Sequence, residues 1–392
     1  MSESPVAEPV PESEEAAHNI KLMGHAGHKT LADTPLARYF EAAVQYESSD
    51  LIMRGGLPPK LRLRGELRSL DGDPPSVEDF NRYIAEGITP AQAKEMHDTG
   101  SLDIGIDFPV KGESHRFRVN VFFTRGRAAI AARRVSNEIL DFNQLHLPPV
   151  MQQIVEVRQG LVLLCGVTGS GKSTTIAAML DWINQNRKCH ILTIEDPIEY
   201  LFTDKKAIIN QREVGLDCAS FPMALRAMVR ENPDVVLIGE MRDQETFEAA
   251  LQAAETGHLV FGTIHASSAT QAFARIYDLF PPEEREAIRS LLAYQMQAFV
   301  YQKLLPTLKE ELPRVPAVEV LLQSPPTRRY ILDGREPELE KVISDNREMG
   351  MRSYVDSLVE LVETNYIHPR VAQSVAPSPE EIKMRLRGIT TR

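Results

Sequence analysis

The sequence predicts a two-domain α/β protein whose larger, C-terminal domain is a parallel sheet built around a phosphate-binding loop. Residues 166–174 read Gly-Val-Thr-Gly-Ser-Gly-Lys-Ser-Thr, a complete G-x-x-x-x-G-K-[ST] motif. An apolar run of strand type precedes it at 160–165, and a segment of helical spacing follows it at 174–182, which is the setting this motif requires. From about Val150 onward strand and helix patterns alternate, which is typical of a parallel sheet.

Composition limits the classes of protein that the chain can belong to. A chain of 392 residues has room for two or three domains, and 43% hydrophobic with 25% charged residues is ordinary for a soluble protein. The net charge of −11 argues against wholesale nucleic-acid binding, with a local basic patch as the alternative. The three cysteines, Cys165, Cys189 and Cys218, form no zinc set and indicate a reducing cytoplasm. Apolar runs all fall short of the ~20 residues of a membrane span, so any membrane contact is expected through a partner.

The N-terminal part of the chain predicts a tail and a small α+β domain. Residues 1–34 have few large apolar side chains and mostly glutamate charge, which predicts a disordered acidic tail. Residues 35–138 predict the domain, in which Leu102 to Phe108 alternate as a half-buried strand should. Its other expected elements are helices at 35–46 and 76–98 and strands at 50–53, 60–63, 116–123 and 128–132.

The C-terminal part begins with a proline-punctuated linker at 139–149 and continues as the nucleotide domain at 150–370. The segment 283–310 and the charged segments from Pro325 to about Tyr366 are expected to be helical. Residues 371–392 are expected to form a flexible tail. The expected strands of the domain are 160–165, 190–194, 235–238 and 259–263.

The phosphate loop carries the clearest chemical signal. Its glycines let the backbone approach phosphate closely, and the following helix directs its positive end at the same point. We expect Lys172 to reach the β- and γ-phosphates and Ser173 to ligate Mg²⁺. The expected nucleotide-binding residues are Gly166, Val167, Thr168, Gly169, Ser170, Gly171, Lys172, Ser173 and Thr174.

A second apolar strand ends in the sequence Gly239-Glu240. In phosphate-loop ATPases a strand beside the loop delivers a carboxylate to the Mg²⁺ and water region. The metal-ligating aspartate of that strand would fall at Gly239, so Glu240 is the residue expected to orient or deprotonate the attacking water. The alternative is an ordinary surface glutamate after a strand.

Three carboxylates, Glu195, Asp196 and Glu199, follow another expected strand. Because open α/β sheets place their sites at the carboxyl ends of strands, one of them is expected to support Mg²⁺ or its waters. A polar loop stabilised by Pro197 is the alternative for Glu195 and Asp196, whereas Glu199 is favoured as functional.

A histidine and several arginines complete the candidates. His265 ends the strand 259–263 region and is expected to sense the γ-phosphate, a structural role being the alternative. Phosphoanhydride hydrolysis benefits from an arginine that meets the developing charge. None adjoins the phosphate loop in sequence, so it must come from elsewhere, including a neighbouring subunit. Arg116, Arg118 and Arg133 lie in the first domain, and a surface ion pair is the alternative for each.

Together these segments resemble the secretion and type IV pilus motor ATPases, in particular the PilT-type retraction branch, from about Leu36 to Tyr366. The stretches that carry the resemblance are GVTGSGKSTT, ILTIEDPIEY, NQREVG, NPDVVLIGEMRD, AETGHLVFGTIHASSA, DLIMRGGLPPKLRLRG, RFRVNVF and GMRSY.

This resemblance implies a RecA-like core, an N-terminal PAS-like domain and a homo-hexameric ring that binds ATP and Mg²⁺. It implies that Glu240 is the catalytic carboxylate, Glu199 the acid of the Asp box and His265 the residue of the His box. Arg118 and Arg133 match arginines of the family that approach the nucleotide. The implied activity is ATP hydrolysis that turns an inner-membrane platform protein and retracts the pilus, as in twitching motility, at the cytoplasmic face of the inner membrane.

Two departures leave alternatives open. Residues 50–53 read Asp-Leu-Ile-Met where the family carries a histidine, and the C-terminal AIRNLIR motif is replaced at 326–332. A PilU-like accessory motor is therefore an alternative, and a second retraction ATPase is a possible partner. An assembly or secretion motor would usually carry a tetracysteine zinc motif, which the three cysteines cannot form. The non-enzymatic alternative is a nucleotide-binding ring scaffold, and a nucleic-acid motor disagrees with the charge.

Overall fold

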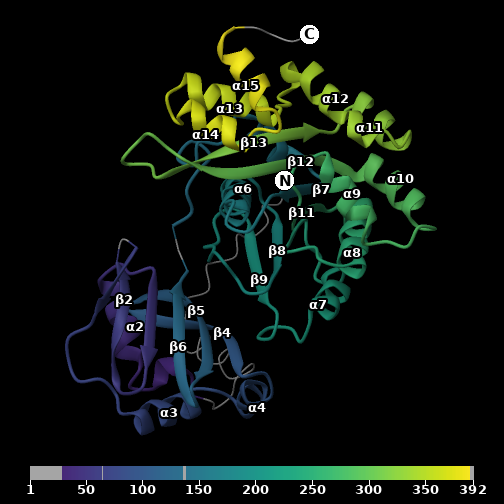
Figure 1. The fold of residues 1–392 in the computed structure, drawn as a ribbon. Coiled ribbons are helices and arrows are strands. Elements are labelled where there is room, and N and C mark those ends of the chain that lie inside the picture. Colours follow the sequence, from purple (N-terminus) through teal and green to yellow (C-terminus); the bar gives the residue numbers. More distant parts are fainter. Residues whose placement is uncertain (1–28, 64, 136–137, 389–392) are drawn as a thin grey trace, which may run out of the picture. The chain divides into compact units, whose positions relative to one another are not determined.

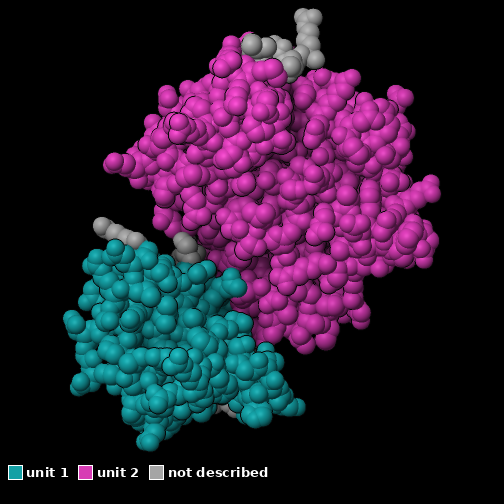
Figure 2. All heavy atoms as spheres, in the orientation of Figure 1, with its two compact units in different colours: residues 1–135 teal, residues 136–392 magenta. Residues whose placement is uncertain are grey.

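The computed structural model describes residues 29–63, 65–135 and 138–388, which form two compact units, 1–135 and 136–392 (Figure 2). Most of the predicted acidic tail, 1–28, lies outside the described residues. Its last part does not match the expected disorder, because Leu31–Asp33 form a short 3-10 helix (η1) and Leu31 is fully buried. Packing of the first unit therefore begins before residue 35.

The first unit is an antiparallel six-stranded sheet in the order β3-β2-β1-β6-β5-β4, with helices packed on it (Figure 1). The predicted helix 76–98 is two helices, because Thr89 caps a new helix that starts at Pro90. The elements are α2 (Ala37–Gln45), β1 (Asp50–Arg54), β2 (Leu57–Leu63), β3 (Glu66–Ser69), α3 (Val77–Glu86), α4 (Pro90–Thr99), β4 (Ser101–Val110), β5 (Glu113–Thr124) and β6 (Arg127–Arg134).

Aromatic packing joins helix α2 to the sheet of the first unit. Phe40 stacks on Phe108 with ring centroids 4.1 Å apart, and Phe117 meets both rings edge-on. Leu102, buried on the same strand as Phe108, confirms the alternation that predicted this strand. The first unit thus has a core of its own.

The second unit is a seven-stranded sheet in the order β13-β12-β7-β11-β10-β8-β9. Neighbouring strands run parallel except for the antiparallel pair β12 and β13. The strands are β7 (Gly160–Cys165), β8 (His190–Glu195), β9 (Ile208–Glu213), β10 (Val235–Ile238), β11 (Leu259–Ile264), β12 (Met296–Pro306) and β13 (Arg314–Leu322). The four strands expected from the sequence are confirmed.

Alternate residues of the buried strands face two separate cores. On β7, Leu161 and Leu163 face one core, with helices α7, α8, α9 and α10, while Val162 and Leu164 face the other, with helices α5 and α6. Both faces of the sheet are therefore covered, as in doubly wound folds. These helices are α5 (Val150–Glu156), α6 (Lys172–Asn186), α7 (Phe221–Met228), α8 (Gln244–Glu255), α9 (Gln271–Tyr277) and α10 (Arg285–Gln295).

The prediction of one helix over 283–310 is wrong in its second half. Helix α10 ends at Gln295, and β12 begins at once and pairs with β7. The apolar run there is buried on both sides, and periodicity does not distinguish such a strand from a buried helix.

The predicted flexible tail at 371–392 is also wrong as far as the structure describes it. Ala372 and Ile382 are fully buried, and Arg385 pairs with Asp356 at 2.6 Å. Residues 389–392 lie outside the described part. The C-terminal elements (Figure 1) are α11 (Pro325–Leu332), η2 (Glu336–Glu338), α12 (Leu339–Asp345), η3 (Arg347–Met349), α13 (Tyr354–Glu363), α14 (Pro369–Val375) and α15 (Pro379–Leu386).

Across residues 29–63, 65–135 and 138–388, the structure has no helix with both the length and the apolar character needed to cross a membrane.

Candidate nucleotide-binding site

The phosphate loop connects the end of β7 to the start of α6. Gly169 and Gly171 have φ angles of 76° and 87°, a left-handed conformation that glycine adopts without strain. Lys172 donates to the carbonyl oxygens of Gly166 and Val167, at 2.8 and 3.1 Å. Burial lowers the pKa of Lys172. The loop thus has the backbone geometry and the cation that an anion site needs.

Gln302 on β12 bonds both the phosphate loop and the first turn of α6. The sequence did not indicate this role for Gln302. Its side-chain amide donates to the carbonyl of Ser170 and accepts from the hydroxyl of Thr175, both at 2.8 Å. A Cβ atom on Gly166 would lie 2.5 Å from the Gln302 carbonyl oxygen. Because the segment was expected to be helical, nothing suggested that Gln302 would lie beside the loop.

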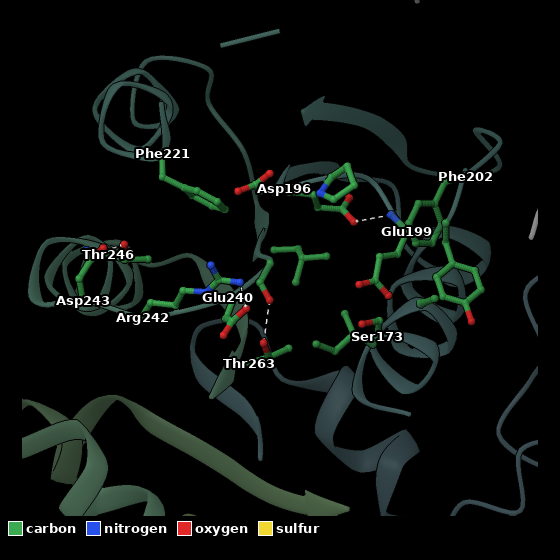
Figure 3. A pocket seen from close by; sticks show the side chains of 17 residues that line it. Ser173, Asp196, Glu199, Phe202, Phe221, Glu240, Arg242, Asp243, Thr246 and Thr263 are labelled. Atoms are coloured by element: carbon green, nitrogen blue, oxygen red, sulfur yellow. Dashed lines mark hydrogen bonds and ion pairs between the residues drawn. The ribbon is translucent and has the colours of Figure 1, made fainter. Parts of the chain in front are cut away.

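A cavity of about 250 Å³ lies beside the first turn of α6. Ser173 and Glu199 line one side of it, and Glu240 and Arg242 line the opposite side (Figure 3). These side chains come from helix α6 and from the loops after β8 and β10. The second unit therefore gathers predicted residues that are far apart in the sequence around one cavity.

Glu240 has a defined partner for each carboxylate oxygen. Arg242 donates to Oε2 at 2.6 Å, and His265 Nε2 lies 3.2 Å from Oε1. The hydrogen bond from Arg242 holds the pKa of Glu240 below its usual range. His265, expected to sense a phosphate, thus contacts the candidate base directly.

Gly239 stands where a metal-ligating aspartate would fall, and the packing around this position favours glycine. A Cβ atom at this position would lie 3.3 Å from the carbonyl oxygen of Ile194 and 3.4 Å from the Cα of Glu195. A side chain here would push against the end of β8. The close approach of the two strands therefore favours glycine.

The three acids after β8 have different surroundings. Glu195 is buried, and burial raises its pKa to about 7. Asp196 and Glu199 are exposed, and both line the cavity. The Glu199 side chain lies on the same side of the cavity as Ser173 (Figure 3). This arrangement agrees with the expectation that both residues support Mg²⁺.

The residues around the cavity fit a magnesium ion bound with a nucleotide. The Ser173 hydroxyl and the Glu199 carboxylate are oxygen donors, which Mg²⁺ prefers. In the part of the chain that the structure describes, no cluster of three His, Cys, Asp or Glu residues suits a metal ion. Mg²⁺ is commonly bound through one or two carboxylates together with substrate phosphates.

Arg118 and Arg133 belong to the first unit, whereas the residues described above all belong to the second. They are directly opposite each other on β5 and β6. Arg133 donates to Asp50 on β1 at 2.9 Å, and both arginines line a hollow in the sheet face. Arg116, by contrast, is buried and pairs with Asp107 at 2.9 Å.

The fold and the site define a phosphate-loop nucleotide-binding protein with a second carboxylate-bearing strand. The chain belongs to the type II/IV secretion system protein family, whose family model matches residues 101–336.

Individual relatives indicate the branch of the family. The chain is 39% identical to the type IV pilus retraction ATPase PilT of Pseudomonas aeruginosa, over 85% of this chain and 95% of that protein. It is 33% identical to the type IV pilus ATPase PilU of the same organism, over 88% of this chain and 89% of that protein.

A crystal structure of the pilus retraction motor PilT with bound ADP matches with a TM-score of 0.78 at 40% identity, covering 88% of this chain and 97% of that one. The expected fold and the homology to PilT are thus confirmed.

Proposed function

We propose that this chain is a motor ATPase that hydrolyses ATP to retract a type IV pilus, and so supports twitching motility. The observation that carries the proposal is the cavity where Ser173 of the phosphate-loop helix faces Glu240 in the loop after β10. A phosphate loop alone would indicate nucleotide binding, whereas a carboxylate across the cavity can also act as a general base on the attacking water. The homology to the retraction ATPase PilT supports pilus retraction rather than pilus assembly as the process that hydrolysis drives.

Residues 166–174 hold the triphosphate in this proposal. Main-chain amides of the loop and the start of α6 bind the phosphate oxygens, and Lys172 turns from the loop carbonyls to the β- and γ-phosphates. Ser173 and Glu199 are the residues that would hold Mg²⁺. Charge on the β- and γ-phosphate oxygens is neutralised by the ion when it is bound.

Glu240 directs the attacking water. A carboxylate oxygen accepts one proton of the water as the new O–P bond forms and the bond to the ADP oxygen breaks. His265 and Arg242 hold the carboxylate in place through its two oxygens. Arg118 and Arg133 of a first unit, in the same or a neighbouring subunit, are proposed to meet the charge that develops on the γ-phosphoryl group.

A homo-hexamer at the cytoplasmic face of the inner membrane completes the proposal. The ring would act on an inner-membrane platform protein, so the chain reaches the membrane only through that partner. A second retraction ATPase is the other partner that we propose. The identity to PilT exceeds that to PilU, 39% against 33%, which favours the retraction motor over the accessory motor. With a net charge of −11 we propose no nucleic-acid partner.

Phosphate release by the purified protein separates an ATPase from a ring scaffold. We expect steady hydrolysis by the wild type and a loss of about 10²- to 10⁴-fold in Glu240→Gln, the range for a positioned general base. Glu255→Gln, an exposed glutamate on α8, is the matched control and should keep the wild-type rate. Equal rates for Glu240→Gln and wild type would remove Glu240 from the mechanism, and no hydrolysis by wild type would favour the scaffold.

A further inference from the structure

Strand β9, at the edge of the second sheet, was not expected from the sequence and has no place in the mechanism above. It pairs with β8 in parallel register, so Glu213 at its end lies opposite Glu195 at the end of β8. Between the two strands runs a loop, residues 196–202, here called the Glu199 loop. The last residues of β9 contact this loop through their side chains.

Gln211 bonds the backbone of the Glu199 loop on both sides of Leu201. Its amide oxygen accepts from the backbone N–H of Phe202 at 3.0 Å, and its amide nitrogen donates to the carbonyl of Tyr200 at 2.8 Å. The same nitrogen lies 3.4 Å from Oε1 of Glu195. One side chain therefore satisfies a donor and an acceptor of the loop backbone at once.

Two buried carboxylates hold the other half of the loop. Glu213 Oε2 accepts from the N–H of Ile198 at 3.1 Å, and Glu195 Oε2 accepts from the N–H of Glu199 at 3.2 Å. Glu213 and Glu195 are only 3% and 7% exposed. Hydrogen bonds in buried surroundings are stronger than those exposed to water, so two consecutive backbone amides, those of Ile198 and Glu199, are restrained.

A further contact ties the Glu199 loop to the phosphate-loop helix. The hydroxyl groups of Tyr200 and Thr174 are 2.7 Å apart, and Thr174 directly follows Ser173. The loop is thus held by β8 and β9 on one side and by the first turn of α6 on the other. Backbone groups at 198, 199, 200 and 202 all have side-chain partners on these strands.

We propose that β9 is a positioning element, in which Gln211 and Glu213 act through the backbone of the Glu199 loop to hold the Glu199 carboxylate beside Ser173. The inference rests on the proposed ATPase function and deepens it. Partners that orient a metal-supporting carboxylate change metal affinity or activity by about 10- to 100-fold when removed. Gln211 is then a positioning residue that the reaction needs although it does not touch the nucleotide.

The test is a double-mutant cycle in the full-length chain. Gln211→Met keeps the side-chain volume and removes both hydrogen-bonding groups, and we expect turnover to fall about 10-fold or more and the Mg²⁺ concentration for half-maximal rate to rise. In a Glu199→Gln background the same change should cost less than about 2-fold, because the residue acts through Glu199. ATP affinity measured without Mg²⁺ should stay within about 2-fold of wild type.

Asn210→Leu is the matched control, since Asn210 is the preceding residue of β9 and bonds His190 at 2.9 Å instead of the loop. It should leave turnover and Mg²⁺ dependence unchanged. If Gln211→Met does not fold, Gln211→Asn, which withdraws the amide by one methylene, takes its place with the same expected results.

Two results would overturn the inference: equal losses in the wild-type and Glu199→Gln backgrounds, or an unchanged Mg²⁺ dependence in the Gln211 variant. The proposed function fails separately, through an absence of hydrolysis by the wild type.

Discussion

Glu240 and Glu199 line the same cavity but are held in different ways. Glu240 is held by its carboxylate, with Arg242 and His265 on its two oxygens. Glu199 is held by its backbone, through Glu195 and the β9 side chains around its loop. In the proposed mechanism the first arrangement aims a carboxylate at the attacking water, whereas the second fixes the place of a carboxylate that would support an ion. The difference teaches that the two acids are not interchangeable.

The largest expected effect beyond Glu240 itself is that of Glu199→Gln. We expect turnover to fall about 10- to 100-fold and to be partly restored by raising Mg²⁺, because the amide still offers an oxygen but no charge. Phosphate release over a Mg²⁺ titration measures this. The Glu240→Gln variant provides the contrast, since added Mg²⁺ should not restore it. Restoration of both, or of neither, would remove the distinction between the two acids.

Removing the Gln302 side chain, which supports the phosphate loop, should weaken nucleotide binding and leave the roles of Glu199 and Glu240 unchanged. In Gln302→Ala the carbonyl of Ser170 and the hydroxyl of Thr175 lose their partner. At about 0.7 kcal/mol for each of the two bonds, within the usual range for a neutral hydrogen bond, ATP affinity should fall about 10-fold. Equilibrium binding of a fluorescent ATP analogue measures this, and kcat at saturating ATP should change far less. An unchanged affinity with reduced kcat would contradict the assignment.

Arg242→Gln tests the cation that holds Glu240. Arg242 lowers the pKa of Glu240, so its removal should raise that pKa and move the acidic limb of the pH–rate profile toward neutral pH. Activity is then lost several-fold more at acidic than at alkaline pH, which kcat/KM measured across pH reports. Glu199→Gln should leave this limb in place. An acidic limb that stays where it is in Arg242→Gln would show that Glu240 is not the titrating base.

The smallest effect concerns Glu319 on β13, which holds a loop in the manner of Glu195. It accepts from the N–H of Ala269, in the loop after His265, at 3.2 Å, and burial raises its pKa from 4.5 to about 8. Between these values the unfolded chain ionises while the folded chain keeps the proton, so the free energy of unfolding falls as pH rises from about 4.5 to 8.

Glu319→Gln cannot ionise and keeps an acceptor for Ala269. We expect its melting temperature, relative to wild type, to be higher at pH 8.5 than at pH 5, because only the wild type loses stability over this range. Thermal unfolding at pH 5 and pH 8.5 measures the difference. A constant difference between the two pH values would show that Glu319 ionises as readily in the folded chain as in the unfolded one.

The sequence predicted the features that short-range patterns encode. The phosphate loop, its flanking strand and helix, and the strands that precede Asp196 and Glu240 follow from motif and apolar runs, and the structure confirms these elements. Strand β9 was missed because its residues, Ile-Ile-Asn-Gln-Arg-Glu, are half polar, and its register is set by β8 rather than by its own pattern. Strand β12 was missed because a run buried on both sides has no strand periodicity.

The supporting side chains depend on contacts between distant segments. Gln302 bonds Ser170 across 132 positions of the chain, and no local signal marks such a partner. Gln211 lies in a stretch that resembled the family, yet only the structure shows it bonded to the loop of Glu199. The C-terminal segment looked like a tail because it is rich in proline and serine, but Ile382 anchors it in the core.

The most direct test of the central claim, that Glu240 directs the cleavage of ATP gripped by the phosphate loop, is the identity of the nucleotide held after incubation with Mg²⁺ and ATP. Rapid separation and chromatography of the bound fraction should show ADP on the wild type and intact ATP on Glu240→Gln, with similar occupancy of the two proteins. ADP on Glu240→Gln, formed as fast as on the wild type, would contradict the account.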